Sequence, residues 1–294
     1  MTTGPAPTAT AGTATATATV GTGTAADGAG VGRLLRQWRL RRRLSQLDLA
    51  LTADSSARHI SFIENGRSRP SRAMVLRLAE HLGVPLRERN SLLVAAGYAP
   101  AYRESSFHDP DDPAMAAVRS AVDTLLRGHQ PYPAVVLDAT HDVLAANSGM
   151  AALLGGVHEQ LLRPPLNLIR VALHPQGLAP RIANLGQVRR HLLERVERHL
   201  AIRETEPLRR LHTEVSRYPG PDEDDDDGGS TPSAPAVALP VRLRTAHGEL
   251  AFVSTIATFN SPLDVAVSEL AIEFFLPADP ATAQIVRREF PSAG

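Results

Sequence analysis

The chain has 294 residues, with 31 basic and 31 acidic side chains, and it contains neither cysteine nor lysine. The lack of cysteine excludes disulfides, thiolate nucleophiles and cysteine-ligated zinc, and the lack of lysine excludes P-loop, Schiff-base and kinase-type lysine chemistry. This length allows two domains, each with its own core.

No stretch approaches the roughly 18 uninterrupted apolar residues that a membrane span requires. The N-terminus has neither the basic start nor the apolar run of a secretion signal. We therefore expect a cytoplasmic protein that does not enter a membrane.

The balanced total charge conceals an uneven distribution. Residues 31–103 carry fourteen Arg and five acidic residues, so 14 − 5 gives +9. Residues 104–294 carry seventeen Arg and twenty-five acidic residues, so 17 − 25 gives −8. A segment as basic as the first predicts an anionic partner, and double-stranded DNA is the leading candidate.

Two segments have compositions that predict disorder. Residues 1–30 are almost wholly Thr, Ala, Gly and Pro, and residues 219–235 are rich in Asp, Gly and Pro, with an acidic run at 222–227. Neither holds enough bulky apolar surface to offset the entropy of ordering a chain. We interpret the first as a disordered tail and the second as a solvated loop.

The basic segment has helical apolar spacing throughout. Serine and proline residues, which favour helix starts, divide it into short pieces, and Gly66 ends the third of them. The predicted helices begin near Val31, Ser45, Ser56, Pro70 and Pro85. Five short helices with short turns predict a compact all-α domain over residues 31–103.

The stretch SFIENGRSRPS, residues 61–71, runs from a helix end through one glycine to two arginines. A helix that enters the major groove has to end before it collides with the DNA backbone. Gly66 permits that exit, and Arg67 and Arg69 are then expected to lie beside phosphates.

The stretch LSQLDLALTADSSARHISFIENG resembles the helix-turn-helix of the XRE, or phage-repressor-like, family of transcriptional regulators. The resemblance implies that Gln46 touches the DNA backbone or a nearby base. It also implies that the next helix presents five residues to the groove: Ser56, Ala57, Arg58, His59 and Phe62. Asp54 and Ser55 replace the turn glycine and the apolar residue of the family pattern, but Asp tolerates a left-handed backbone, so the turn is still expected.

Two of these side chains suit base recognition. A guanidinium such as that of Arg58 pairs with guanine in bidentate fashion, and the ring of Phe62 suits a thymine methyl group. The alternative is that Arg58 is simply solvated and that Phe62 packs on a neighbouring helix. Glu64 is expected to tie this helix to the following loop.

The second half begins after a polar, proline-broken stretch at 104–113 and predicts an α+β domain. A helix is expected over 115–126, followed by YPAVVLDATHDVLAANSGMAALLGG, which has the pattern of strand, turn, strand and Asn-capped helix. The middle is mostly helical. Three strand-like runs close the chain, at 237–244, 249–259 and 268–276.

The opening of this half resembles a PAS-type sensor, and the order of its segments over 103–276 resembles the ligand-binding half of the MmyB-like regulators. The resemblance implies a PAS-like domain, with an antiparallel sheet flanked by helices, that spans residues 104–294 and holds a small apolar or fatty-acid-like ligand. Candidate polar anchors for that ligand are Asn147, His174 and Arg181. Each also has a plainer interpretation, as a helix cap, a loop-bonded histidine or a surface arginine.

Other functions remain open at this stage. The second half could instead dock another protein, or it could be an enzyme fused to a DNA-binding domain. For catalysis the support is weak, because His158-Glu159 begins an HExxH pattern that fails at Leu162, and because His191 and His199 lack a third metal ligand. We expect a non-catalytic homodimer that presents two recognition helices to a roughly palindromic site.

Overall fold

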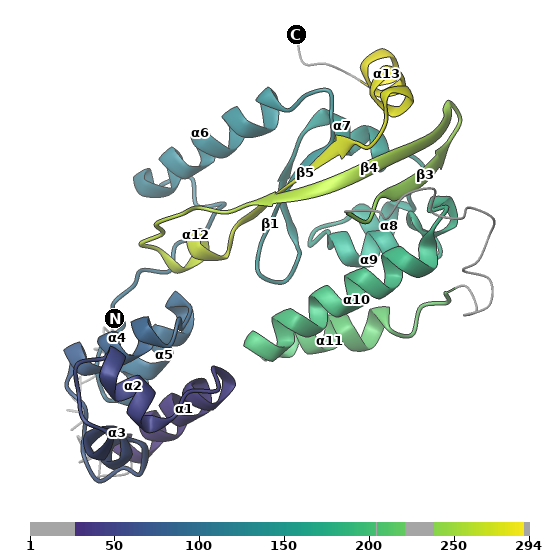
Figure 1. Ribbon diagram of the computed structural model, residues 1–294. Helices are drawn as coiled ribbons and strands as arrows, with labels where there is room; N and C mark the ends of the chain where they lie inside the picture. Colours follow the sequence, from purple (N-terminus) through teal and green to yellow (C-terminus); the bar gives the residue numbers. More distant parts are fainter. Residues whose placement is uncertain (1–26, 204, 221–237, 291–294) are drawn as a thin grey trace, which may run out of the picture. The chain divides into compact units, whose positions relative to one another are not determined.

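The computed structural model describes residues 27–203, 205–220 and 238–290 (Figure 1). The chain divides into two compact units. The first comprises the described residues up to Val84 together with Glu88–Ala101, and the second comprises Pro85–Arg87 and the described residues from Tyr102 onward. Of the two segments predicted to be disordered, residues 1–26 and 221–235 lie outside the described ranges.

The first unit is helical, as predicted. Helix α1 starts at Asp27, so residues 27–30 are helical and do not belong to a disordered tail. The helices are α1 (Asp27–Arg41), α2 (Gln46–Thr52), α3 (Ala57–Glu64), α4 (Arg72–His81) and α5 (Leu86–Ala95). Ser45, Ser56 and Ser71 cap α2, α3 and α4 through their side chains, so the serine start signals were correct.

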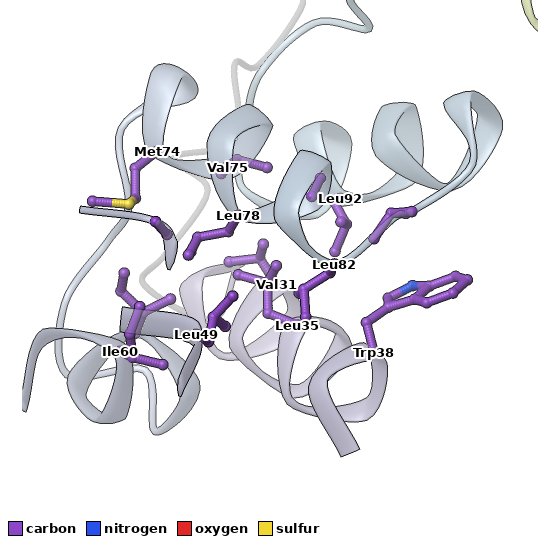
Figure 2. Packing of buried hydrophobic residues seen from close by; sticks show 14 of the residues in the cluster. Val31, Leu35, Trp38, Leu49, Ile60, Met74, Val75, Leu78, Leu82 and Leu92 are labelled. Atoms are coloured by element: carbon purple, nitrogen blue, oxygen red, sulfur yellow. The ribbon is translucent and has the colours of Figure 1, made fainter. Parts of the chain in front are cut away.

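All five helices contribute to one apolar core (Figure 2). Its fully buried members include Val31 and Leu35 from α1, together with Leu49, Ile60 and Leu92 from other helices. The helices α2 and α3 are joined by a tight turn at Asp54, whose φ of 47° is the left-handed geometry expected there. This turn sets the angle at which α3 leaves α2.

The second unit is built on a five-stranded sheet in which all neighbouring strands are antiparallel. Its order is β2-β1-β5-β4-β3. The strands are β1 (Ala134–Leu137), β2 (Val143–Ala146), β3 (Val241–Thr245), β4 (Gly248–Ala257) and β5 (Ala271–Pro277). The predicted opening strand pair and the three predicted closing strands are therefore all present, with ends shifted by a few residues.

Helices pack on both faces of this sheet (Figure 1). On one face, Val136 and Ile272 pack with Met115 and Val122 of α6. On the other face, the described helices between β2 and β3 cover Val135 and Phe252. The helix on the first face is α6 (Pro113–Gly128). The elements between β2 and β3 are α7 (Ser148–Leu153), α8 (Glu159–Leu162), α9 (Leu168–Leu173), η1 (Ala179–Arg181), α10 (Leu185–Ile202) and α11 (Glu206–Val215).

Two helices near the end of the chain were not predicted. α12 (Val265–Glu269) occupies the start of the run that was expected to be a strand from residue 268, and α13 (Pro280–Glu289) follows β5. Both have an aspartate N-cap, Asp264 for α12 and Asp279 for α13. Among the helices in the described ranges, none is long and apolar enough to cross a membrane.

Candidate DNA-binding surface and ligand cavity

The N-terminus of α3 is held by its own side chains. The Ser56 Oγ accepts a hydrogen bond of 3.1 Å from the His59 backbone N–H, and the Ser55 Oγ lies 3.4 Å from the His59 Nδ1. Polar Ser55 therefore has a polar neighbour at a position where the family pattern has an apolar residue. The departure from that pattern leaves the turn intact.

The C-terminus of α3 is fixed by a buried ion pair. The Glu64 carboxylate accepts hydrogen bonds of 2.6 and 2.8 Å from Arg39 and one of 2.8 Å from the Gln46 Nε2. Arg39 also donates to the Leu44 carbonyl, and its hydrogen bonds to Glu64 raise its pKa above the ordinary value. This network joins α1, the start of α2 and the end of α3, so it sets the position of α3.

Arg39 is buried, although it lies outside the stripe of apolar residues on α1. Arg39 is only 6% exposed. Its charge is tolerated inside the unit because Glu64 compensates it. The apolar spacing of α1 gave no sign of this role. Glu64 was expected to tie α3 to the following loop, but it instead pairs with Arg39 of α1 and Gln46 of α2.

The outer face of α3 carries the residues predicted to read DNA. Arg58 is exposed, and its guanidinium lies over the Phe62 ring at 5.2 Å from the ring centre. Ser56 is exposed as well, whereas Ala57, His59 and Phe62 are half-buried. The cation–π contact supports Arg58 while leaving its N–H groups on the outside.

The two arginines after Gly66 differ. Arg67 is exposed, and Gly66 before it has the left-handed φ of 69° that the exit from α3 requires. Arg69 donates two hydrogen bonds, of 3.2 and 2.9 Å, to the Ala96 carbonyl and lies over the Tyr98 ring. Arg69 thus ties the loop to the end of α5, whereas Arg67 makes no such tie.

The second unit contains a cavity of about 90 Å³ between the sheet and the helices α7, α9 and α10. Most of its lining is aliphatic or aromatic and includes Met150, Ile169, Leu192, Phe252 and Phe275. Its polar lining residues are His191, Arg195, Ser254 and Glu273. An apolar cavity with a few polar groups is the usual form of a small-molecule site.

Two of the polar lining residues form a buried ion pair. The Arg195 Nη1 on α10 donates to the Glu273 Oε2 on β5 over 2.9 Å, and the two side chains are 9% and 6% exposed. Glu273 lies in a central strand between β1 and β4. The cavity therefore has one fixed polar wall that joins α10 to the sheet.

Two stacked histidines lie next to this ion pair. The rings of His141, in the β1–β2 turn, and His199, one turn after Arg195 on α10, are parallel, with centres 4.9 Å apart. Burial, and after it the positive charge of Arg195, lowers the pKa of His141 to about 3. Burial and then Arg195 also lower the pKa of His199, so both rings are neutral at neutral pH.

The three predicted ligand anchors have structural partners. Asn147 caps α7 and bonds the Leu126 and Tyr132 carbonyls. The His174 Nδ1 accepts from the Gln176 N–H, and Arg181 donates to the carbonyls of Leu153, Gly155 and Arg244. None of the three lies in the lining of this cavity, and each is bound to backbone groups.

His191 and His199, which were considered as possible metal ligands, lie on α10 in different surroundings. His191 is exposed but lines the cavity, and His199 is half-buried against His141. Within the described ranges, no three His, Asp or Glu side chains come together in a way that could hold a metal ion.

Two family models match the chain. The family described as MmyB-like transcription regulator ligand binding domain matches residues 118–288, which is more than half of the 294 residues. The chain belongs to this family. A second family, described as helix-turn-helix, matches residues 35–89 of the regulator, which include α2 and α3.

Two solved structures similar to the regulator are crystal structures of the clp gene regulator ClgR from Corynebacterium glutamicum. One is 22% identical and covers 24% of this chain and 88% of its own, with a TM-score of 0.22. The other is 20% identical and covers 36% of this chain and 95% of its own, also with a TM-score of 0.22. No curated protein sequence matches the chain.

The two families together define the class of the protein. It is a DNA-binding transcriptional regulator with an N-terminal helix-turn-helix and a C-terminal ligand-binding domain. The cavity described above lies inside the matched ligand-binding region.

Proposed function

We propose that this regulator binds a specific duplex sequence as a homodimer in the cytoplasm, and that a small, mainly apolar ligand in the cavity controls that binding. In this proposal the protein acts by binding and not by catalysis. The observation that carries the DNA part is the exposed Arg58, whose guanidinium lies over the half-buried Phe62 ring on α3. The far end of this helix is anchored by the buried Arg39–Glu64 pair.

Arg58 is proposed to read a base. Its guanidinium is exposed on the first turn of α3, the part of a recognition helix that reaches base edges. Phe62, one turn later, is proposed to meet a thymine methyl group. Ser56, Ala57 and His59 complete the proposed groove-facing set.

Other residues are proposed to position the unit on the duplex. Arg67 is an exposed cation directly after α3 and suits a phosphate contact. Gln46 and Arg69 both have partners within the protein, in Glu64 and the Ala96 carbonyl, so any phosphate contact they make uses their remaining N–H groups. Their contribution to affinity is therefore expected to be smaller than that of Arg67.

The ligand proposal is supported by the composition and size of the cavity. A volume of about 90 Å³ is smaller than the roughly 300–1,000 Å³ of drug-sized sites, so a compact ligand fits directly and a longer one has to displace side chains. The lining comes from α7, α9, α10, the residues flanking η1, and the strands β3, β4 and β5 with the segment before β3. A ligand that prefers one arrangement of these elements shifts the population toward it.

The DNA proposal is tested with two arginine variants. Arg58→Ala is expected to lose preference for the operator over random duplex by about 1–3 kcal/mol, because a base contact is removed. Arg67→Ala is expected to weaken binding to all sequences and to reduce the salt dependence, because a phosphate contact is removed. Fluorescence anisotropy with both duplexes over a range of salt concentrations measures the two effects.

The matched control is Arg198→Ala, which removes an exposed arginine of α10 in the second unit and should leave both affinities unchanged. Equal losses on operator and random duplex for Arg58→Ala would contradict its assignment as a base-reading residue. Unchanged binding for both α3-region variants would contradict the proposed surface as a whole.

A further inference from the structure

Two ion pairs hold α10 against the segment that runs from α12 into β5. Arg195 donates to Glu273 on β5 over 2.9 Å. Arg203, which follows the last residue of α10, donates over 2.5 Å to Glu269 at the end of α12. Eight residues of a helix span about 12 Å and four residues of extended chain span about 13 Å, so the two arginines match the spacing of the two acids. The end of α10 is therefore fixed to Glu269.

Glu269 has a second cationic partner, Arg87. The Arg87 Nε and Nη2 donate to the two carboxylate oxygens over 2.8 and 2.9 Å, which is the bidentate geometry of strong ion pairs. The Glu269 side chain is only 17% exposed, so water competes weakly for its oxygens. One carboxylate thus joins the end of α10 to Arg87.

Arg87 is the second residue of α5, a helix that begins in the second unit and continues into the first. Pro85–Arg87 belong to the second unit, whereas Glu88–Ala101 belong to the first. Further along α5, Leu92 and Leu93 are fully buried in the core that also holds α3. A helix is a rigid element, so a displacement of its first turn is carried to the residues that pack in that core.

We propose that Glu269 is the positioning residue through which α10 acts on the helix-turn-helix. Leu192 and Arg195 on α10 line the cavity, so a ligand that moves α10 also moves its end at Arg203. The carboxylate that Arg203 binds is the one that holds Arg87 at the start of α5. This inference rests on the proposed ligand control of DNA binding and names its route.

The test is a double-mutant cycle that uses substitutions in place of a ligand. Leu192→Phe places added bulk in the cavity and displaces α10 from inside. Glu269→Ala removes the proposed link. Fluorescence anisotropy with the operator duplex gives the affinities of the wild-type full chain, the two single variants and the double variant. A purely structural role for Glu269 gives additive effects, whereas a positioning role gives a coupling between the two substitutions.

We expect Leu192→Phe to change the DNA affinity by about fivefold or more when Glu269 is present. In the Glu269→Ala background the same substitution should change it by less than about twofold. Glu104→Ala is the matched control, because Glu104 binds the same arginine but belongs to the segment before α6. Leu192→Phe should keep its full effect in the Glu104→Ala background.

Each other outcome overturns a defined part of the account. If the wild-type chain does not bind duplex DNA, the proposed function itself fails. If it binds, but Leu192→Phe has no effect or has the same effect with and without Glu269, this inference fails and the proposed function stands. Loss of the effect in the Glu104→Ala background would also overturn the assignment to Glu269. If circular dichroism shows that Leu192→Phe is unfolded, Ala172→Leu, which fills the same cavity from α9, replaces it in the cycle.

Discussion

At the scale of single residues, His141 makes the stability of the ligand-binding unit depend on pH. It has a left-handed φ of 65°, is fully buried and stacks on His199. Its pKa is about 3 in the folded protein and about 6.5 in an unfolded chain. Between these values the unfolded chain binds a proton that the folded protein does not, so stability is complete above about pH 6.5 and falls as the pH decreases toward 3.

We predict that His141→Asn reduces this loss, because Asn accepts a left-handed φ but does not titrate. In the wild-type protein the histidine contributes a loss of up to about 1.4 kcal/mol per pH unit below pH 6.5. Urea unfolding followed by circular dichroism at pH 7 and pH 5 measures the difference between the two proteins. Trp38, the only tryptophan, lies in the first unit, so its fluorescence follows unfolding of that unit. The pH dependence of this unfolding should be the same in both proteins. An identical pH dependence in both proteins would contradict the role given to His141.

At the scale of elements, the helix-turn-helix depends on close contact between α1 and α3. A Cβ atom placed on Gly32 would lie 2.2 Å from the Ile63 carbonyl oxygen and 2.8 Å from that of Glu64. Both are backbone atoms and cannot move aside as a flexible side chain would. The glycine therefore lets α1 cross the end of α3.

We predict that Gly32→Ala destabilises the first unit by about 1–3 kcal/mol, as expected for overpacking, and weakens DNA binding through displacement of α3. Gly30→Ala is the matched control on the same helix, because a Cβ there meets no atom within 4 Å. The control should be neutral or slightly stabilising, since alanine is the better helix former. Urea titration of Trp38 fluorescence in the full chain compares the two. Equal stability for both variants would contradict the close contact.

The elements that local chemistry specifies could be predicted from the sequence. Serine caps marked three helices of the first unit, and β-branched runs with tight turns marked the strands. The polar sites could not be predicted in the same way, because Arg39 pairs with Glu64 25 residues away and Arg195 with Glu273 78 residues away. Of the anchors chosen from the sequence, Asn147 caps its helix and His174 bonds a neighbouring backbone N–H, as their plainer interpretations had it, whereas Arg181 binds carbonyls that only the folded chain brings to it.

At the scale of the whole molecule, the chain combines a unit that binds DNA with a unit that binds a ligand. A homodimer would present two α3 helices about 34 Å apart, which corresponds to roughly 10 base pairs between half-site centres. In the proposed function, the ligand would act by favouring one disposition of the paired helices over another. Sequence-specific binding through α3 is the claim on which this regulation depends.

The most direct test is selection from a random duplex library with the purified full chain, followed by sequencing of the retained DNA. We predict enrichment of a single site with two inverted half-sites whose centres lie about 10 base pairs apart, and loss of that enrichment in Arg58→Ala. Retention of all sequences alike, or no retention of duplex DNA even in dilute salt, would contradict the assignment of α3 as the recognition helix.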